Sequence, residues 1–326
     1  MMWLVWGGFV LFVIGCLALD LGVLNRKDHV IEFRESLRWT GLWVAVALAF
    51  SGVIYSLYEH HVAALGYSHT PALRADGASA VLQFLSGYVV EYSLSVDNIF
   101  VIALIIGHFK VPRPLQHGVL FWGILGALVL RGMMIGLGAA LIHQFSWMME
   151  VFGALLVFTA MRMAVSKENE GADLEQGLVV RTARRFIPVS MTFAGHKFFV
   201  RHAGRRTATP LLLVLLLVET TDILFAVDSI PAVFAVTQDP FLVFTSNVFA
   251  IMGLRSLYFA VAGLIDQFHY LKFSLVVLLA TIGVKMLIAR WIHVANWQSL
   301  LAIVAILGAG VVASVLRKRR LDRATV

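Results

Sequence analysis

Two apolar stretches of the chain carry nearly the same acidic pattern, Glu91-Tyr-Ser-Leu-Ser-Val-Asp97-Asn98-Ile99 and Asp222-Ile-Leu-Phe-Ala-Val-Asp228-Ser229-Ile230. Each lies within a hydrophobic segment that is long enough to cross a lipid bilayer. A charged side chain at the centre of a membrane costs about 2.5–3.5 kcal/mol on insertion scales, so intramembrane carboxylates usually mark ion or proton pathways. The pattern therefore predicts a membrane protein that handles a cation.

The composition also indicates a polytopic membrane protein. Of the 326 residues, 60% are hydrophobic and 14% are charged, which is outside the range of ordinary soluble domains. Apolar runs of about 20 residues predict an all-α fold with nine transmembrane helices and no large soluble domain. These runs cover residues 3–24, 39–59, 81–107, 118–141, 147–165, 211–236, 241–265, 271–290 and 297–316.

The net charge of +7 is interpreted as a topology signal. Lys and Arg gather in alternating connections, most densely in 167–209 and in the tail Arg317-Lys318-Arg319-Arg320. By the positive-inside rule, the N-terminus lies outside and the C-terminus in the cytoplasm of a cell membrane, taken as a bacterial inner membrane. The expected partners are the lipid bilayer, a divalent metal ion and protons, and no nucleic acid.

The chemistry of the remaining residues limits the classes of function. Cys16 is the single cysteine, so a disulfide within one chain is excluded. The chain has no phosphate-binding loop of the Walker type, which favours a secondary transporter over an enzyme, with no cofactor.

An internal repeat organises the chain. Leu130-Arg131 parallels Leu254-Arg255, and the step of 31 residues from Arg131 to Arg162 parallels the step of 30 from Arg255 to Lys285. Because each copy holds three spans, the second copy enters the membrane from the opposite side, giving the 3+3 inverted-topology repeat that is common in secondary transporters. The predicted parts are two extra spans (1–59), repeat 1 (81–166), a cytoplasmic loop (167–209), repeat 2 (211–290), and a last span with a basic tail (297–326). Within the loop, the stretch from Lys197 to Arg201 fits either a small β-hairpin or a solvated loop.

The intramembrane polar residues form the candidate cation site. The predicted metal ligands or proton carriers are Glu91, Asp97, Asn98, Glu219, Asp222 and Asp228, with Asp20, Ser229 and Asn247 as accessory residues and Arg131 and Arg255 as counter-charges. Five carboxylates against two guanidinium groups leave three unmatched negative charges, which a divalent cation or protons would balance. The alternative is a purely structural ion-pair network.

Helix geometry predicts which carboxylates meet. Residues six apart differ by 120° net and about 9 Å of rise, so Glu91 and Asp97 cannot hold one ion from an ideal helix. If the helix centres lie near Leu94 and Leu224, antiparallel packing places Glu91 level with Asp228, and Asp97 level with Asp222. Pro231 also predicts a kink beside Asp228 that frees the carbonyl of Val227.

An all-oxygen site suits Mn²⁺, Mg²⁺ or Ca²⁺ rather than Cu or Zn. Carboxylates are also natural proton carriers, because a low dielectric favours their neutral form. The residues themselves therefore predict a proton-coupled transporter of divalent cations.

At these positions the chain resembles the TerC family of integral membrane proteins, most closely its Alx branch. The matching motifs are Leu19-Asp20, Glu91-x5-Asp97-Asn98, Val129-Leu-Arg131, Phe198-Phe-Val-Arg201, Val218-Glu219, Phe225-Ala-Val-Asp228-Ser-Ile-Pro231, Thr245-Ser-Asn247 and Gly253-Leu-Arg255. The resemblance implies a Mn²⁺ exporter of the LysE superfamily. The alternatives are a Ca²⁺/H⁺ exchanger, or a membrane scaffold or redox modulator in a stress-response complex for tellurite resistance.

Overall fold

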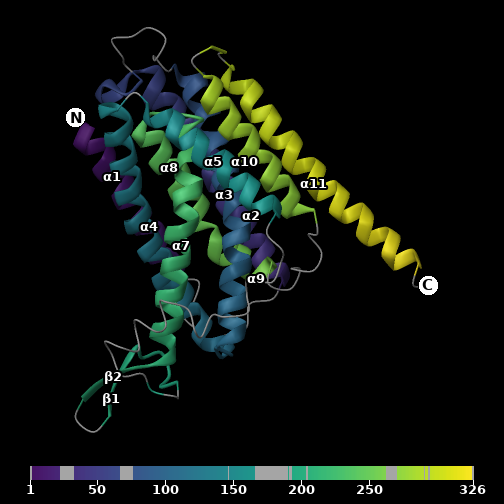
Figure 1. The fold of residues 1–326 in the computed structure, drawn as a ribbon. Helices are drawn as coiled ribbons and strands as arrows, with labels where there is room; N and C mark the ends of the chain where they lie inside the picture. The colour runs from purple at the N-terminus through teal and green to yellow at the C-terminus, as the bar shows by residue number, and fades with distance from the viewer. Residues whose placement is uncertain are drawn as a thin grey trace.

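The structure is a computed structural model, and it describes residues 2–22, 33–66, 76–145, 147–165, 190, 193–202, 205–261, 270–289, 291–292 and 294–324. These parts form a bundle of long helices with a small β-hairpin at one end, as Figure 1 shows. The elements are α1 (Met2–Gly22), α2 (Phe33–Glu59), η1 (Val62–Ala64), α3 (Gly77–His108), α4 (Arg113–Gln144), α5 (Met148–Val165), β1 (Phe199–His202), β2 (Arg205–Ala208), α7 (Pro210–Phe234), α8 (Pro240–Met252), α9 (Leu254–Val261), α10 (Leu271–Ile288) and α11 (Asn296–Ala324). The predicted all-α class of a polytopic membrane protein is confirmed.

The described helices lie at the positions of the predicted spans, but the predicted number of nine transmembrane helices is not confirmed. Within the predicted run 241–265, the residues that the structure describes form α8 and α9, which meet at Gly253. Glycine has a low helix propensity, and the 13 residues of α8 are too few to cross a bilayer by themselves. In the described parts of the chain, seven helices are long and apolar enough to span a membrane, namely α1, α2, α3, α4, α5, α7 and α11.

Local sequence signals explain where several helices begin. The side chain of Asp76 caps α3 by accepting a hydrogen bond from the backbone N–H of Ser79 at 2.8 Å. Asp239 caps α8 in the same way, and it also accepts a hydrogen bond from the Tyr58 hydroxyl at 2.8 Å. Burial raises the pKa of Asp239, while its hydrogen bonds act in the opposite direction. This residue therefore joins the end of α2 to the junction between α7 and α8.

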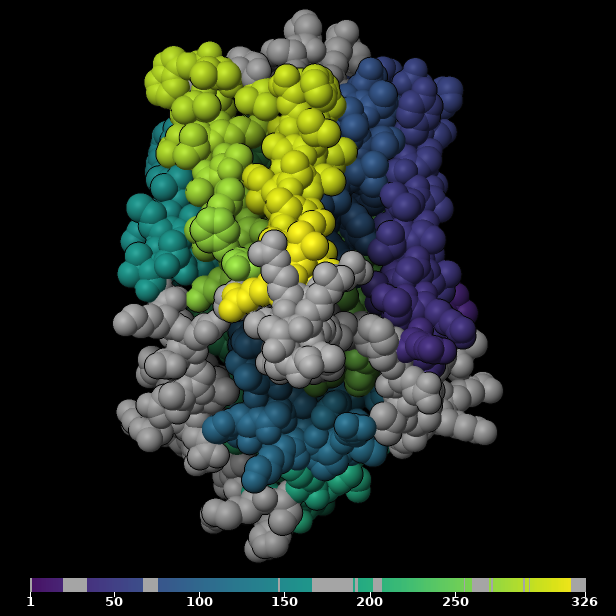
Figure 2. Space-filling model, turned by 90° about the vertical axis from the view of Figure 1, so that its right-hand side faces the viewer, coloured from purple at the N-terminus to yellow at the C-terminus, as the bar shows by residue number. Residues whose placement is uncertain are grey.

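Helix α3 lies at the centre of the bundle and contacts α2, α7, α8, α9 and α11. Figure 2 shows α10 and α11 side by side on one face, with α3 between α11 and α2. Helices α5 and α10 approach very closely at two glycines. A Cβ atom on Gly283 would lie 2.9 Å from the carbonyl oxygen of Gly153, so neither position has room for a side chain.

The proline in α7 does not end the helix. α7 contains Pro231 in its last turn and continues as one helix to Phe234. Coordination of a cation by the carbonyl of Val227 stays a prediction.

The described part of the connection 167–209 contains a small β-hairpin, which was one of the two structures that its sequence predicted. Strands β1 and β2 are antiparallel, with Phe199 opposite Ala208 and His202 opposite Arg205. The hydroxyl of Thr209 donates to the carbonyl of Lys197 at 2.8 Å, which fixes the hairpin to the start of α7. Figure 1 shows the hairpin at the end of the molecule where α7 begins. Residues 166–189 lie outside the described part.

Candidate cation site

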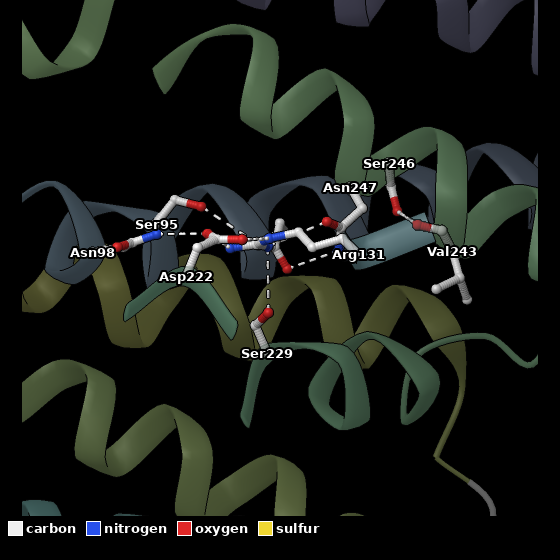
Figure 3. A network of polar contacts seen from close by, with 9 residues as sticks. Ser95, Asn98, Arg131, Asp222, Ser229, Val243, Ser246 and Asn247 are labelled. Carbon is white, nitrogen blue, oxygen red and sulfur yellow. Dashed lines mark hydrogen bonds and ion pairs between the residues drawn. The ribbon is translucent and has the colours of Figure 1, made fainter. Parts of the chain in front are cut away.

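The centre of the bundle holds three charged side chains that are shielded from solvent. Glu91 of α3 is 0% exposed, Arg131 of α4 is 2% exposed and Asp222 of α7 is 4% exposed. Figure 3 shows the Arg131 side chain extending between Asp222 and the amide of Asn247 from α8. Because these side chains are buried from bulk solvent, their charges must be satisfied mainly by one another and by neighbouring polar groups.

Arg131 is the hub of this network. Its Nε donates to Asp222 Oδ2 at 3.1 Å and its Nη2 donates to Asp222 Oδ1 at 2.8 Å, a bidentate pair. Its Nη1 forms an ion pair with Glu91 and donates to Asn247 Oδ1 at 3.2 Å and to Ser229 Oγ at 3.4 Å. One guanidinium group therefore binds carboxylates from two different helices.

Two amides complete the shell around the carboxylates. Asn247 Nδ2 donates to Glu91 Oε2 at 2.9 Å, and Asn98 Nδ2 donates to Asp222 Oδ1 at 2.8 Å. The Oδ1 atom of Asn98 is buried and has no hydrogen-bond partner among the described residues. One guanidinium can balance only one of the two carboxylates if both are ionised, and the centre also holds one amide oxygen, Asn98 Oδ1, that lacks a partner among the described residues.

The structure pairs the carboxylates differently from the expected crossing. Asp222, rather than Asp228, lies opposite Glu91. The midpoint of α3 falls between Tyr92 and Ser93, and that of α7 falls at Asp222, because the observed helix ends differ from the assumed spans. Glu91 and Asp222 are therefore the residues that meet at mid-height.

The other predicted carboxylates lie outside the Arg131 network. Asp97 is partly buried on α3, where the charge of Lys272 from α10 acts on it. Asp228 accepts a hydrogen bond at 2.8 Å from the hydroxyl of Thr159 on α5. These two acids thus face different helices on either side of the centre.

Glu219 occupies a third environment, between α7 and α4. A Cβ atom on Gly126 would overlap with its carboxylate, so this glycine provides the room for Glu219. Its Oε2 atom is buried and has no hydrogen-bond partner within the described structure. Asp20 and Arg255 belong to α1 and α9, but their side chains lie outside the described part.

Two features of the site were missed from the sequence. Ser95 donates to Glu91 Oε1 at 3.5 Å, and its position four residues after Glu91 was a usable signal. Thr159 had no such signal.

Among the described residues, no group of three or more His, Cys, Asp or Glu side chains is arranged to hold a metal ion. Asn98, Asp222, Ser229 and Asn247 do gather around Arg131, as Figure 3 shows.

The fold and this centre define a polytopic α-helical membrane protein with buried carboxylates paired to an arginine. The chain belongs to the TerC family of integral membrane proteins, whose family model matches residues 76–322.

Relatives match over almost their whole length. A Myxococcus xanthus protein named "Uncharacterized membrane protein STKORF319" is 47% identical over 314 residues, covering 96% of this chain and 92% of the relative. An Escherichia coli K12 protein named "Putative membrane-bound redox modulator Alx" is 44% identical over 292 residues, covering 89% and 88%. A Rickettsia bellii membrane protein is 35% identical over 318 residues, covering 98% and 99%. No solved structure matches.

Proposed function

We propose that this protein is a secondary transporter that exports Mn²⁺ from the cytoplasm in exchange for protons. The observation that carries the proposal is the sharing of one buried guanidinium, Arg131, by two buried carboxylates, Glu91 and Asp222. A structural ion pair needs one acid for one base. The second acid leaves a negative charge in the membrane interior, which is costly unless a cation or a proton neutralises it.

The geometry suggests how an ion would bind. Arg131 occupies the space between Glu91 and Asp222, so a divalent ion that uses both carboxylates must displace the guanidinium from at least one of them. Asn98 Oδ1 and Asn247 Oδ1 supply neutral oxygens of the type that hard divalent cations prefer. Protons on the carboxylates would complete the return half of the cycle.

The choice among divalent ions rests on family resemblance. Oxygen ligands suit Mn²⁺, Mg²⁺ and Ca²⁺ alike. Mn²⁺ is the ion that the resemblance to the TerC family implies, and Ca²⁺/H⁺ exchange is the alternative within transport.

The helix contacts support the inverted repeat. If repeat 1 and repeat 2 exchange places, α3 takes the place of α7, α4 takes that of α8 and α9 together, and α5 takes that of α10, and the reverse. Under this exchange the α3–α8 contact becomes the α4–α7 contact, and the α5–α7 contact becomes the α3–α10 contact; all four are observed. The pairs α3–α7, α4–α8 and α5–α10 map onto themselves, and each is also in contact.

The acidic pattern follows the same exchange. Glu91 and Asp222 hold equivalent positions in the two copies, and they meet at Arg131. Asp97 and Asp228 are also equivalent, and they face the equivalent helices α10 and α5. The proposed architecture is nine membrane segments, with α8 and α9 together forming one of them, and with the N-terminus outside and the C-terminus inside a bacterial inner membrane.

A second candidate is redox modulation, which is favoured by the name of the Alx relatives. Cys16 is the only thiol in the chain, so a thiol–disulfide cycle would need a partner molecule. Under this candidate the membrane protein acts as a scaffold and moves no ion.

Transport by the purified protein in liposomes separates the candidates. We expect Mn²⁺ flux that depends on an imposed pH gradient, and loss of that flux in Asp222→Asn and Glu91→Gln, which keep size and hydrogen bonding but remove charge. Asp76→Asn is the matched control, because Asp76 caps α3 at the end of the bundle and asparagine is an equally good cap. Absence of flux for Mn²⁺ and Ca²⁺ alike in the wild type would overturn the proposal, and Ca²⁺ flux alone would support the alternative exchanger.

A further inference from the structure

A small cavity of about 30 Å³ lies beside the Arg131 network, between α3, α4, α7 and α9. A volume of this size is large enough to hold a water molecule. Asn98 and Asp222 form its polar side, and the rest of its wall is largely apolar, including Ile102, Leu120, Leu254 and Tyr258. The buried oxygen of Asn98 that has no partner among the described residues thus belongs to a residue that lines this space.

The cavity lies on the hairpin side of the network. Its residues come from the last third of α3 and from the first halves of α4 and α7, which are the ends of these helices nearest the β-hairpin. Asp222 lines the cavity and also binds Arg131 directly. A path through this cavity would therefore connect the hairpin side of the protein with the central carboxylates.

Helix α9 forms one wall of the cavity. After the break at Gly253, Leu254 and Tyr258 lie one helical turn apart and both contribute to the cavity wall. The Tyr258 hydroxyl donates a hydrogen bond to Gln116 Oε1 at 3.4 Å, and Gln116 Nε2 donates one to the carbonyl of Val111 at 3.0 Å. A long hydrogen bond of this kind is weak compared with the bidentate Arg131–Asp222 pair.

We propose that α9 is the gate of the hairpin-side access to the cation site, with Gly253 as its pivot and the Tyr258–Gln116 hydrogen bond as its latch. The purpose of this gate rests on the transport function proposed above, whereas the gate itself could exist without transport. Gly253 suits a pivot because its surroundings are not tight. A Cβ atom there would lie 3.4 Å from the ring of Tyr92 and 3.6 Å from the carbonyl of Ala250, which are ordinary contacts.

Thiol accessibility tests the gate without requiring transport. In a Cys16→Ser background the chain has no other cysteine, so Ala127→Cys places a single reporter on the cavity wall. We expect the thiol of Ala127→Cys to react slowly with a membrane-impermeant methanethiosulfonate. Vesicles of the two opposite orientations should show that this reaction occurs only when the hairpin side faces the reagent. Tyr258→Phe should raise this rate about twofold, which corresponds to the loss of one weak hydrogen bond at the lower end of the usual range. Tyr55→Phe, which changes an exposed tyrosine on α2, should leave the rate unchanged.

Two further variants test the pivot and the latch. Gly253→Ala should slow the labelling of Ala127→Cys, because alanine favours a continuous helix through the break. With Gln116→Cys and Tyr258→Cys, a short bifunctional methanethiosulfonate should link α4 to α9, stop Mn²⁺ flux, and release it again on reduction.

The outcomes separate the gate from the transport function. Labelling that is equally fast from both sides, or that is unaffected by Tyr258→Phe and Gly253→Ala, would overturn the gate. Failure of the cross-linker to join the two cysteines would contradict the contact itself. If labelling behaves as expected while the wild type moves no ion, the gate stands and the proposed function fails.

Discussion

Arg131 binds two acids at once, and this sets the chemistry of the centre. Arginine suits such a role because its planar group carries five donors and remains charged in a buried setting. Here it donates to Asp222 in bidentate fashion while also reaching Glu91, Asn247 and Ser229. If Glu91 and Asp222 are both ionised, Arg131 balances one of their two negative charges.

We expect Arg131→Gln to destabilise the protein strongly. Removal of one partner from a buried ion pair costs about 3–5 kcal/mol, because the remaining charge is left uncompensated. Asp222→Asn should cost clearly less, since Glu91 and Arg131 then form a neutral pair. Thermal unfolding in detergent measures both effects, and equal unfolding temperatures for the two variants would contradict this charge balance.

At the scale of helices, α5 and α10 approach closely at Gly153 and Gly283. Membrane helices lack a hydrophobic driving force between them, so small residues that allow close van der Waals packing stabilise their contacts. Under the proposed inverted repeat, the two helices are equivalent to each other. α5 also contacts α7, and α10 also contacts α3, so this close approach lies beside the helices that carry Asp222 and Glu91.

We predict that Gly283→Ala separates α5 from α10 and lowers stability by about 1–3 kcal/mol, as overpacking in a tight core does. The added methyl group would meet backbone, the carbonyl oxygen of Gly153, which cannot move aside as a flexible side chain would. Gly136→Ala is the matched control, since a Cβ atom there has no neighbour within 4 Å. The control should unfold at the same temperature as the wild type or slightly above it, because alanine is the better helix former. A similar result for Gly283→Ala would show that this contact is not needed.

For the whole molecule, the central question is how two copies of one acidic pattern come together. Glu91 of the first acidic pattern and Asp222 of the second both pair with Arg131, whereas Asp97, on the same helix as Glu91, lies in different surroundings. One centre thus receives a carboxylate from each copy of the pattern.

A double-mutant cycle on unfolding free energy tests the shared centre. Glu91→Gln and Asp222→Asn should deviate from additivity by about 0.5–3 kcal/mol, because both residues bind the same guanidinium. Glu91→Gln and Asp97→Asn should be nearly additive. Strong coupling in the second pair and none in the first would mean that each repeat builds its own site.

Much of the fold was predictable because the signals for it are local. The positions of the membrane helices follow from apolar runs, since the free energy of moving a segment into lipid is close to a sum over its residues. The acidic pattern also marked Asp222, Asn98 and Ser229 for the site, and Arg131 as their counter-charge. The hairpin near Lys197 stayed open between two readings because short alternating stretches carry weak signals.

By itself, the sequence determined that this is an all-α membrane protein of repeated acidic helices, because hydrophobicity and motif spacing are properties of each segment. Only the tertiary structure decided that Glu91 and Asp222 bind the same arginine, that α8 and α9 meet at Gly253, and that residues of α9 line a cavity beside this centre. A shift of one residue along a helix moves a side chain by 1.5 Å and turns it by about 100°. The partners of a side chain therefore depend on helix ends and on packing between distant segments, which no single stretch of sequence contains.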